Sequence, residues 1–299
     1  MPELAWDGVI ARERTGLGAR PRSVGLNMIL DKGLGTVATQ DVLEVGADHI
    51  DHWKLSFGTS VFVRPEVLRH KLELLARHEV LTFPGGTLLE AAVVQGHCRP
   101  YMERARELGF SAVEVSDGTI PLPAERRRNM IACARDAGLI PITEVGKKDP
   151  RQQPTPNQLA EEALQDLEWG ARWVVVEGRE GGTSVGIYDD AGRVLEQALE
   201  TIARAMGDQV GRLIWEAPQM RQQADLIARF GETVNLGNIP PHEILALESL
   251  RAGLRFETLK PIAEELQRRG GWSPEAQEPL AADPVPVDER GVVPAADWD

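Results

Sequence analysis

A repeated strand-and-helix pattern constrains the fold of this 299-residue chain more than any other feature. Eight short apolar runs recur, and each is followed by Gly, Pro or Ser and then by a longer segment with helical periodicity. Successive runs begin 20 to 40 residues apart, close to the roughly 30 residues that a strand and its crossover helix need. We therefore predict strands at 24–30, 49–54, 80–83, 112–116, 139–145, 173–177, 213–216 and 233–236.

The number of repeats favours one particular α/β architecture. Three intervening segments have clear helical character, at 65–78, 123–137 and 157–169, and the first two begin with proline in the first turn. Eight strands that alternate with helices predict a (β/α)8 barrel of the TIM type, because open doubly wound sheets usually stop at five to seven strands. The open sheet remains the alternative. We expect one barrel domain over residues 1–270.

Composition restricts the partners and the compartment. The chain has 33 Lys and Arg against 46 Asp and Glu, a formal net charge of −13, which disfavours binding to nucleic acid or to an anionic membrane. We find no transmembrane segment and no basic signal peptide, and we expect a cytoplasmic protein that could form a homo-oligomer. Residues 271–299 hold five prolines, seven acidic groups and one basic group, so we expect an extended or disordered tail.

Lysines gather where the chemistry of a barrel takes place. In (β/α)8 barrels the reacting groups lie at the C-terminal ends of the strands. Four of only six lysines fall at these predicted ends: Lys32, Lys54, Lys147 and Lys148. An ammonium group can act as a proton donor and can also attract an anion. The alternative is that these lysines are surface residues that keep the loops soluble.

Three neighbouring strands are predicted to end in a carboxylate: Glu144, Glu177 and Glu216. On adjacent strands these groups would lie within several ångströms of one another and would need a counter-charge. Mg²⁺ suits such hard oxygen ligands, so we predict a magnesium site. Zinc is disfavoured, because the histidines and cysteines lack ligand spacing. The alternative is ion pairing without a metal, with Lys54, Lys147 and Arg179 as the cations.

Glycine-rich turns late in the chain indicate an anion site. Gly182 lies in the segment after the sixth predicted strand, and Gly237 and Asn238 follow the eighth. Backbone amides at such positions often bind phosphate in barrels, aimed by the start of a helix. Neither segment is a P-loop or a dinucleotide-binding motif.

Six ordered segments resemble those of the phosphosulfolactate synthase family: MILDKG at 28–33, DHWKLSFGTS at 51–60, FPGGTL at 83–88, EVSDG at 114–118, EVGKK at 144–148 and VNLGNI at 234–239. The resemblance runs from about residue 25 to residue 259. It implies a (β/α)8 barrel and a Mg²⁺-dependent addition of sulfite to phosphoenolpyruvate that gives (2R)-phosphosulfolactate, a step towards coenzyme M.

The charged and glycine residues at the predicted strand ends suit that chemistry. We expect Lys54 to protonate C2 of the substrate, with Lys147 as the second candidate. Glu144, Glu177 and Glu216 would hold the metal, with Glu114 and Asp117 as substitutes. The phosphate and sulfite would be received by Lys32, Arg179 and the amides of Gly182, Gly237 and Asn238.

Two other functions stay open. The family resemblance extends to plant proteins in which the barrel serves protein homeostasis, so one alternative is a non-catalytic interaction protein. The other is an enzyme of the same mechanism with a different nucleophile or enol-phosphate acceptor, because the fold does not fix the substrate.

Overall fold

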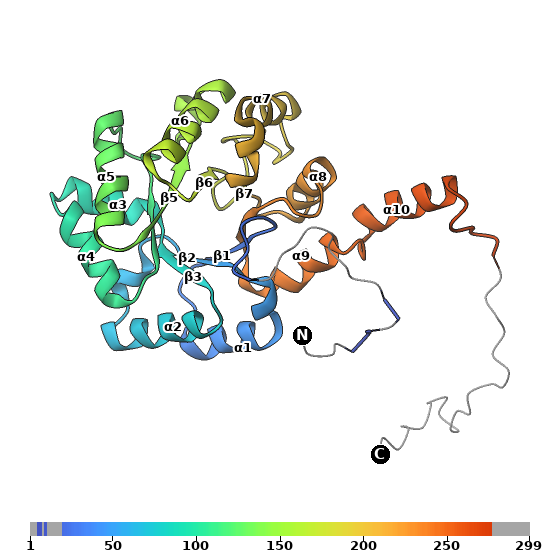
Figure 1. The fold of residues 1–299 in the computed structure, drawn as a ribbon, viewed down its shortest axis with the longest axis horizontal. Helices are drawn as coiled ribbons and strands as arrows, with labels where there is room; N and C mark the ends of the chain where they lie inside the picture. Colours follow the sequence, from blue (N-terminus) through green and yellow to red (C-terminus); the bar gives the residue numbers. More distant parts are fainter. Residues whose placement is uncertain (1–4, 8, 11–19, 277–299) are drawn as a thin grey trace, which may run out of the picture. The chain divides into compact units, whose positions relative to one another are not determined.

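The computed structural model describes residues 5–7, 9–10 and 20–276 and contains one sheet of eight parallel strands (Figure 1). The strands are hydrogen-bonded in the order β3-β2-β1-β8-β7-β6-β5-β4. Their bounds are β1 Asn27–Asp31, β2 His52–Leu55, β3 Leu81–Pro84, β4 Ala112–Val115, β5 Ile140–Val145, β6 Trp173–Val176, β7 Leu213–Glu216 and β8 Leu236–Ile239.

A side chain joins the two ends of this sheet. Ser111, just before β4, accepts a hydrogen bond at Oγ from the Thr82 amide (2.8 Å), and its own amide donates to the Thr82 carbonyl (3.2 Å). The strands thereby form a nearly closed ring. The predicted (β/α)8 barrel is confirmed, and the open doubly wound sheet is wrong.

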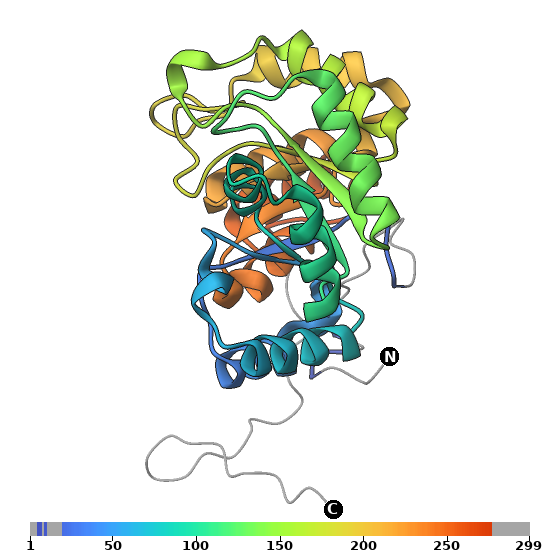
Figure 2. The same ribbon diagram turned by 90° about the vertical axis from the view of Figure 1, so that its left-hand side faces the viewer.

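The helices between residues 36 and 251 lie around the outside of the strand ring, as two perpendicular views show (Figure 1, Figure 2). The predicted helices at 65–78, 123–137 and 157–169 are observed within one or two residues of their expected ends. The helices are α1 Thr36–Gly46, α2 Pro65–Arg77, α3 Gly86–Val94, α4 Cys98–Leu108, α5 Ala124–Asp136, α6 Pro156–Trp169, α7 Glu196–Met206, α8 Met220–Phe230, α9 Ile244–Arg251 and α10 Phe256–Arg268.

The eighth strand begins three residues later than predicted, at Leu236 instead of residue 233. At Asn235 the side chain makes hydrogen bonds to the neighbouring chain segments. Its Oδ1 accepts from the Leu26 amide (3.0 Å), and its Nδ2 donates to the Leu213 carbonyl (2.9 Å). Gly237 and Asn238 therefore belong to β8 and not to a loop that precedes a helix. Asn238 has a φ of 57°, and the register between β1 and β8 shifts beside it.

The barrel interior changes from apolar to charged along the strand direction. Its N-terminal half is filled by apolar side chains such as Ile142, Val175 and Ile214. Side chains alternate between the two faces of a strand, so the residue two positions further on also points inward. That residue is a glutamate in β5, directly after β6 and in β7, so three buried carboxylates lie at the C-terminal end of the barrel.

His52 lies at the level of the apolar half. Its ring contacts Trp173 edge-on, with ring centroids 4.7 Å apart, and Phe83 at 6.2 Å. Its Nδ1 has no hydrogen-bond partner among the described residues. Burial lowers the pKa of His52 to about 4, so the buried ring is neutral at pH 7.

We expect His52 to make the protein less stable in mild acid. The folded-state pKa lies below the unfolded value of 6.5, so the unfolded chain binds a proton first and stability falls between pH 6.5 and about 4. From pH 7 to pH 5 the free energy of unfolding should fall by about 2 kcal/mol more in the wild type than in His52→Leu. Urea unfolding at the two pH values measures this, and equal losses in both proteins would contradict it.

The chain divides into two compact units, Met1–Thr258 and Leu259–Asp299. The first contains all eight strands. The second contains most of α10, none of whose residues is buried. The predicted tail at 271–299 lies outside the described residues from 277 on. Among the residues that the structure describes, no helix is long and apolar enough to cross a membrane.

Candidate functional site

Three buried glutamates meet at the C-terminal end of the barrel. Glu144 in β5, Glu177 directly after β6 and Glu216 at the end of β7 each offer a carboxylate oxygen, and these oxygens lie within 4.8 Å of one another. Each residue is only 2% exposed. The structure therefore brings together the three predicted metal ligands.

The ammonium group of Lys54 lies among these carboxylates. Its Nζ is 3.0 Å from Glu144 Oε2 and 3.1 Å from Glu216 Oε1. A fourth carboxylate, that of Glu114 in β4, approaches within 2.8 Å. The second oxygen of Glu114 accepts a hydrogen bond from the Gly86 amide at 2.6 Å. Lys54 thus connects β2 with β4, β5 and β7 across the barrel.

Lys148 supplies the second ammonium group. Its Nζ donates to Glu144 Oε1 at 2.8 Å and also pairs with Glu177. The turn after β5 places it there, because Gly146 has a φ of 111° and interrupts the alternation of the strand. A Cβ at Gly146 would lie 2.9 Å from the Glu177 Cβ, so any other residue would disturb the cluster.

The pKa values show how this cluster shares its charge. Burial raises the pKa of Glu114, to about 7, although Lys54 partly offsets the effect. Burial together with the neighbouring carboxylates raises the pKa of Glu177 well above its ordinary value. Burial alone would also raise the pKa of Glu144, but Lys148 and Lys54 outweigh this effect and lower the pKa. Burial would lower the pKa of Lys54, yet the three carboxylates around it raise the pKa well above its usual range.

The residues of the cluster fit a divalent cation. Four carboxylates share two ammonium groups, which leaves a formal excess of two negative charges inside the barrel. A buried charge excess is costly unless protons or a cation neutralise it. All the donors are hard oxygen atoms, the type that Mg²⁺ prefers. We name these six residues the carboxylate cluster: Lys54, Glu114, Glu144, Lys148, Glu177 and Glu216.

The remaining predicted cations lie around the cluster. Lys147 points away from it and pairs with Asp117, whose carbonyl also accepts from Nζ at 3.0 Å. Lys32 is half exposed, pairs with Glu180 and lies 6.0 Å from the ring centroid of Phe57. Arg179 is exposed, and its amide donates to Glu177 Oε1 at 2.7 Å.

The three predicted anion-binding turn residues lie in different surroundings. Gly182 accepts a hydrogen bond at its carbonyl from Gln222 Nε2 (2.7 Å), which fixes the loop after β6. Gly237 lies in β8 against Met28, and its carbonyl accepts from the Ala217 amide (2.9 Å). Asn238 donates from Nδ2 to the Arg179 carbonyl at 3.2 Å, and its buried Oδ1 has no partner among the described residues.

Three charged residues on helices hold these loops, and none of them was predicted as a site residue from the sequence. Lys71 of α2 pairs with the buried Asp31 at the end of β1 and donates to the Leu34 carbonyl at 2.7 Å. Glu90 of α3 accepts from Ser116 Oγ (2.7 Å) and from two amides of the loop after β4. A charged residue on the apolar face of a helix was the available signal.

Arg127 of α5 is the most connected of these missed residues. It is 3% exposed and forms a two-point ion pair with the buried Asp166 of α6, with Nε 2.8 Å from Oδ1. It also donates to the Glu144 carbonyl at 3.0 Å and to Asp117 at 3.2 Å. Arg127 therefore links two outer helices to the strand that carries a member of the carboxylate cluster.

Comparison with known proteins agrees with the resemblance seen in the sequence. A family model described as (2R)-phospho-3-sulfolactate synthase (ComA) matches residues 16–257. A phosphosulfolactate synthase of Methanothermobacter thermautotrophicus is 39% identical over 245 residues, which cover 81% of this chain and 94% of the relative. One of Bacillus subtilis is 34% identical over 241 residues, which cover 80% and 94%.

A solved structure shares the fold at low sequence identity. The 3-hexulose-6-phosphate synthase of Salmonella typhimurium superposes with a TM-score of 0.53 and is 12% identical, covering 77% of this chain and all of that protein. This likeness concerns the barrel alone.

Proposed function

The chain belongs to the phosphosulfolactate synthase family of lyase-type enzymes, and from this membership we propose that it adds sulfite to phosphoenolpyruvate to give (2R)-phosphosulfolactate. In that reaction the sulfur of sulfite forms a bond to C3, the C2–C3 double bond becomes a single bond and C2 receives a proton. Negative charge develops on the substrate carboxylate before the proton arrives. The site must therefore hold anions, stabilise this charge and deliver one proton.

The position of Lys54 is the observation that carries the proposal. Its ammonium group lies inside the C-terminal end of the barrel, and the surrounding carboxylates keep it protonated. A protonated amine is the form that can give a proton, and the carbanion-like C2 is basic enough to take it. Lys148 lies in the same cluster, whereas Lys147 pairs with Asp117 at its edge, so Lys148 is the better placed second cation.

Glu144, Glu177 and Glu216 would hold the metal, with Glu114 as a further oxygen donor. Bound Mg²⁺ would supply positive charge for the substrate carboxylate. Lys32 and Arg179 would receive the phosphate and sulfite groups at the mouth of the site, together with the backbone amide of Asn238. The amides of Gly182 and Gly237 remain predicted contributors.

The activity is tested with purified protein, phosphoenolpyruvate, sulfite and Mg²⁺. We expect phosphoenolpyruvate to be consumed only when sulfite is present, with the phosphate retained in the product. Replacement of sulfite by sulfate serves as the control, because sulfate has no nucleophilic lone pair on sulfur. Consumption that does not depend on sulfite would identify another nucleophile and contradict the proposal.

We expect the activity to disappear on dialysis against a chelator and to return with Mg²⁺, because the carboxylate cluster carries excess negative charge. Binding is measured separately from activity, as the rise in the thermal unfolding midpoint that Mg²⁺ causes in chelator-treated protein. The double variant Glu144→Gln/Glu216→Gln should lose this rise. The control Glu66→Gln, at an exposed position of α2, should keep it. Full activity in metal-free buffer would refute the metal site.

A further inference from the structure

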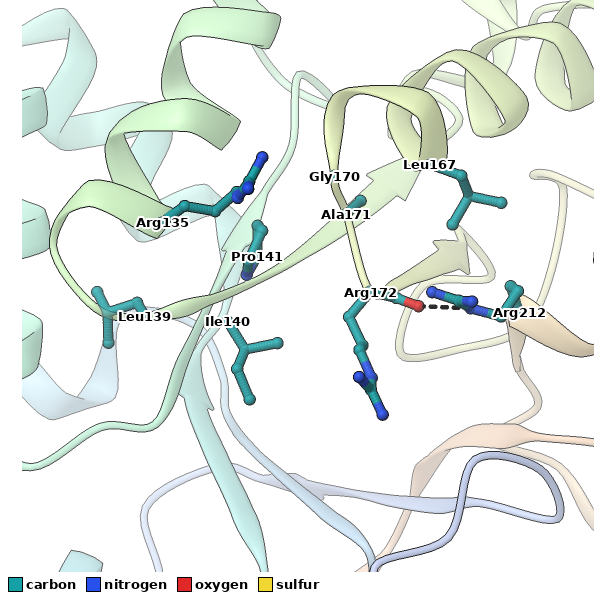
Figure 3. A pocket seen from close by; sticks show the side chains of 9 residues that line it. All are labelled: Arg135, Leu139, Ile140, Pro141, Leu167, Gly170, Ala171, Arg172 and Arg212. Atoms are coloured by element: carbon teal, nitrogen blue, oxygen red, sulfur yellow. Dashed lines mark hydrogen bonds between the residues drawn. The ribbon is translucent and has the colours of Figure 1, made fainter.

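A shallow cavity, open to solvent, lies at the opposite end of the barrel from the carboxylate cluster. It is lined where β5, β6 and β7 begin and where α5 and α6 end, and its volume is about 490 Å³ (Figure 3). The glutamates of the cluster lie at the other ends of the same parallel strands. The cavity is therefore separate from the site described above.

Three arginines line this cavity: Arg135, Arg172 and Arg212. No Asp or Glu belongs to its lining among the described residues. None of the three arginines forms an ion pair with a carboxylate that the structure describes, although the chain as a whole has 46 acidic residues. In a protein with a net charge of −13, three unpaired guanidinium groups around one cavity form a local positive site.

Uncharged partners hold these guanidinium groups in place. Arg212 donates from Nε to the Arg172 carbonyl at 2.8 Å, as the dashed line in Figure 3 shows. The guanidinium carbon of Arg172 lies 5.1 Å from the ring centroid of Trp173. Arg135 reaches from the end of α5 to Gly170, where a Cβ would come within 2.8 Å of its Nη1. These contacts use few of the five N–H donors of each arginine, so most donors remain for a ligand.

Apolar side chains form the rest of the lining. Leu139 lies directly before β5, Ile140 is its first residue, and Leu167 contributes from the last turn of α6. A cavity lined by guanidinium groups and apolar side chains suits a ligand that has an anionic head and an apolar body. Inorganic phosphate alone would fill only part of it.

We propose that this cavity binds a small organic anion, one with a phosphate, sulfonate or carboxylate group joined to an apolar body. The arginines bind the anionic group, and Leu139, Ile140 and Leu167 contact the body. The proposal stands independently of the reaction at the other end of the barrel. It assigns to the N-terminal end a binding site in addition to the catalytic one.

The test uses isothermal titration calorimetry of the full chain at low ionic strength, with phenyl phosphate as the probe and inorganic phosphate for comparison. We expect phenyl phosphate to bind the wild type more tightly than inorganic phosphate does. The double variant Arg172→Gln/Arg212→Gln should bind phenyl phosphate about tenfold more weakly or worse, because two charged hydrogen-bond donors are lost.

Two further proteins keep the test falsifiable. Arg77→Gln/Arg128→Gln removes the same charge from exposed positions on α2 and α5 and should bind like the wild type. Arg135→Gln should weaken binding at least threefold, which covers the case in which the double variant does not fold. Equal affinity in the wild type, Arg135→Gln and the double variant would place the probe elsewhere and overturn the proposal, as would the absence of binding to the wild type.

Discussion

Replacement of Lys54 by alanine should lower kcat by roughly 10²–10⁴-fold, the usual contribution of a general acid. In the structure the Lys54 ammonium group lies 2.8 to 3.1 Å from three buried carboxylates and is 6% exposed. Water cannot readily take its place as a positioned proton donor. Steady-state kinetics with phosphoenolpyruvate and sulfite measure the loss, and the effect should fall on kcat more than on KM.

Two further variants separate proton donation from charge. Lys54→Arg should recover little of kcat, because a guanidinium group keeps the charge but does not readily give up a proton. Lys260→Ala removes an exposed lysine of α10 and should leave kcat unchanged. If arginine restored most of kcat, Lys54 would be an electrostatic anchor, and Lys148 or Lys147 would have to supply the proton. Circular dichroism and thermal unfolding check that each variant is folded.

Replacement of Arg127 by alanine should destabilise the fold by about 3–5 kcal/mol, the usual effect of removing one partner from a buried ion pair. Asp166, which is fully buried, would lose the two-point ion pair that neutralises it. The Glu144 carbonyl and Asp117 would each lose a donor as well. Urea unfolding at pH 7 measures the change.

The neighbouring Arg128 provides the matched control for Arg127. It is exposed on the same helix, so Arg128→Ala should change the free energy of unfolding by less than about 0.5 kcal/mol. Arg127→Lys should recover only part of the stability, because an ammonium group cannot make the two-point contact with Asp166. Similar losses in the two alanine variants would mean that the network around Arg127 does not stabilise the fold.

The local pattern of the sequence was sufficient to predict the barrel. The strand and helix patterns of the sequence agree with the observed elements along most of the chain, and each of the eight predicted strands overlaps an observed one. The eighth strand was placed too early because Val234 and Asn235 have the apolar and polar alternation of a strand. Only the tertiary structure shows that the Asn235 side chain takes ladder positions beside β1 and β7.

The carboxylates of the site could be predicted for a geometric reason. Strands of a barrel are parallel, so residues at their C-terminal ends meet, and this rule was enough to bring Glu144, Glu177 and Glu216 together. The rule does not extend past the strand end. At Gly146 the backbone turns with a positive φ, so sequence alone could not show that Lys148 reaches the cluster while Lys147 turns to Asp117.

Site-supporting residues on the helices could not be predicted from the positions of the strand ends. Lys71, Glu90 and Arg127 support the strand-end loops from α2, α3 and α5, and their partners lie 10 to 40 positions away in the sequence. Each interrupts the apolar face of a helix, a pattern that indicates a buried charge without indicating its partner.

The most direct test of the proposed chemistry is the reaction in deuterated water, followed by ¹H, ¹³C and ³¹P NMR of the product. We predict one product with the sulfonate on C3, a single deuterium on C2 in one configuration and the phosphate still attached. This result would show sulfur addition and delivery of a proton from one face in the same turnover. Release of inorganic phosphate, a product with no deuterium on C2, or no product from the folded, Mg²⁺-loaded protein would contradict the account.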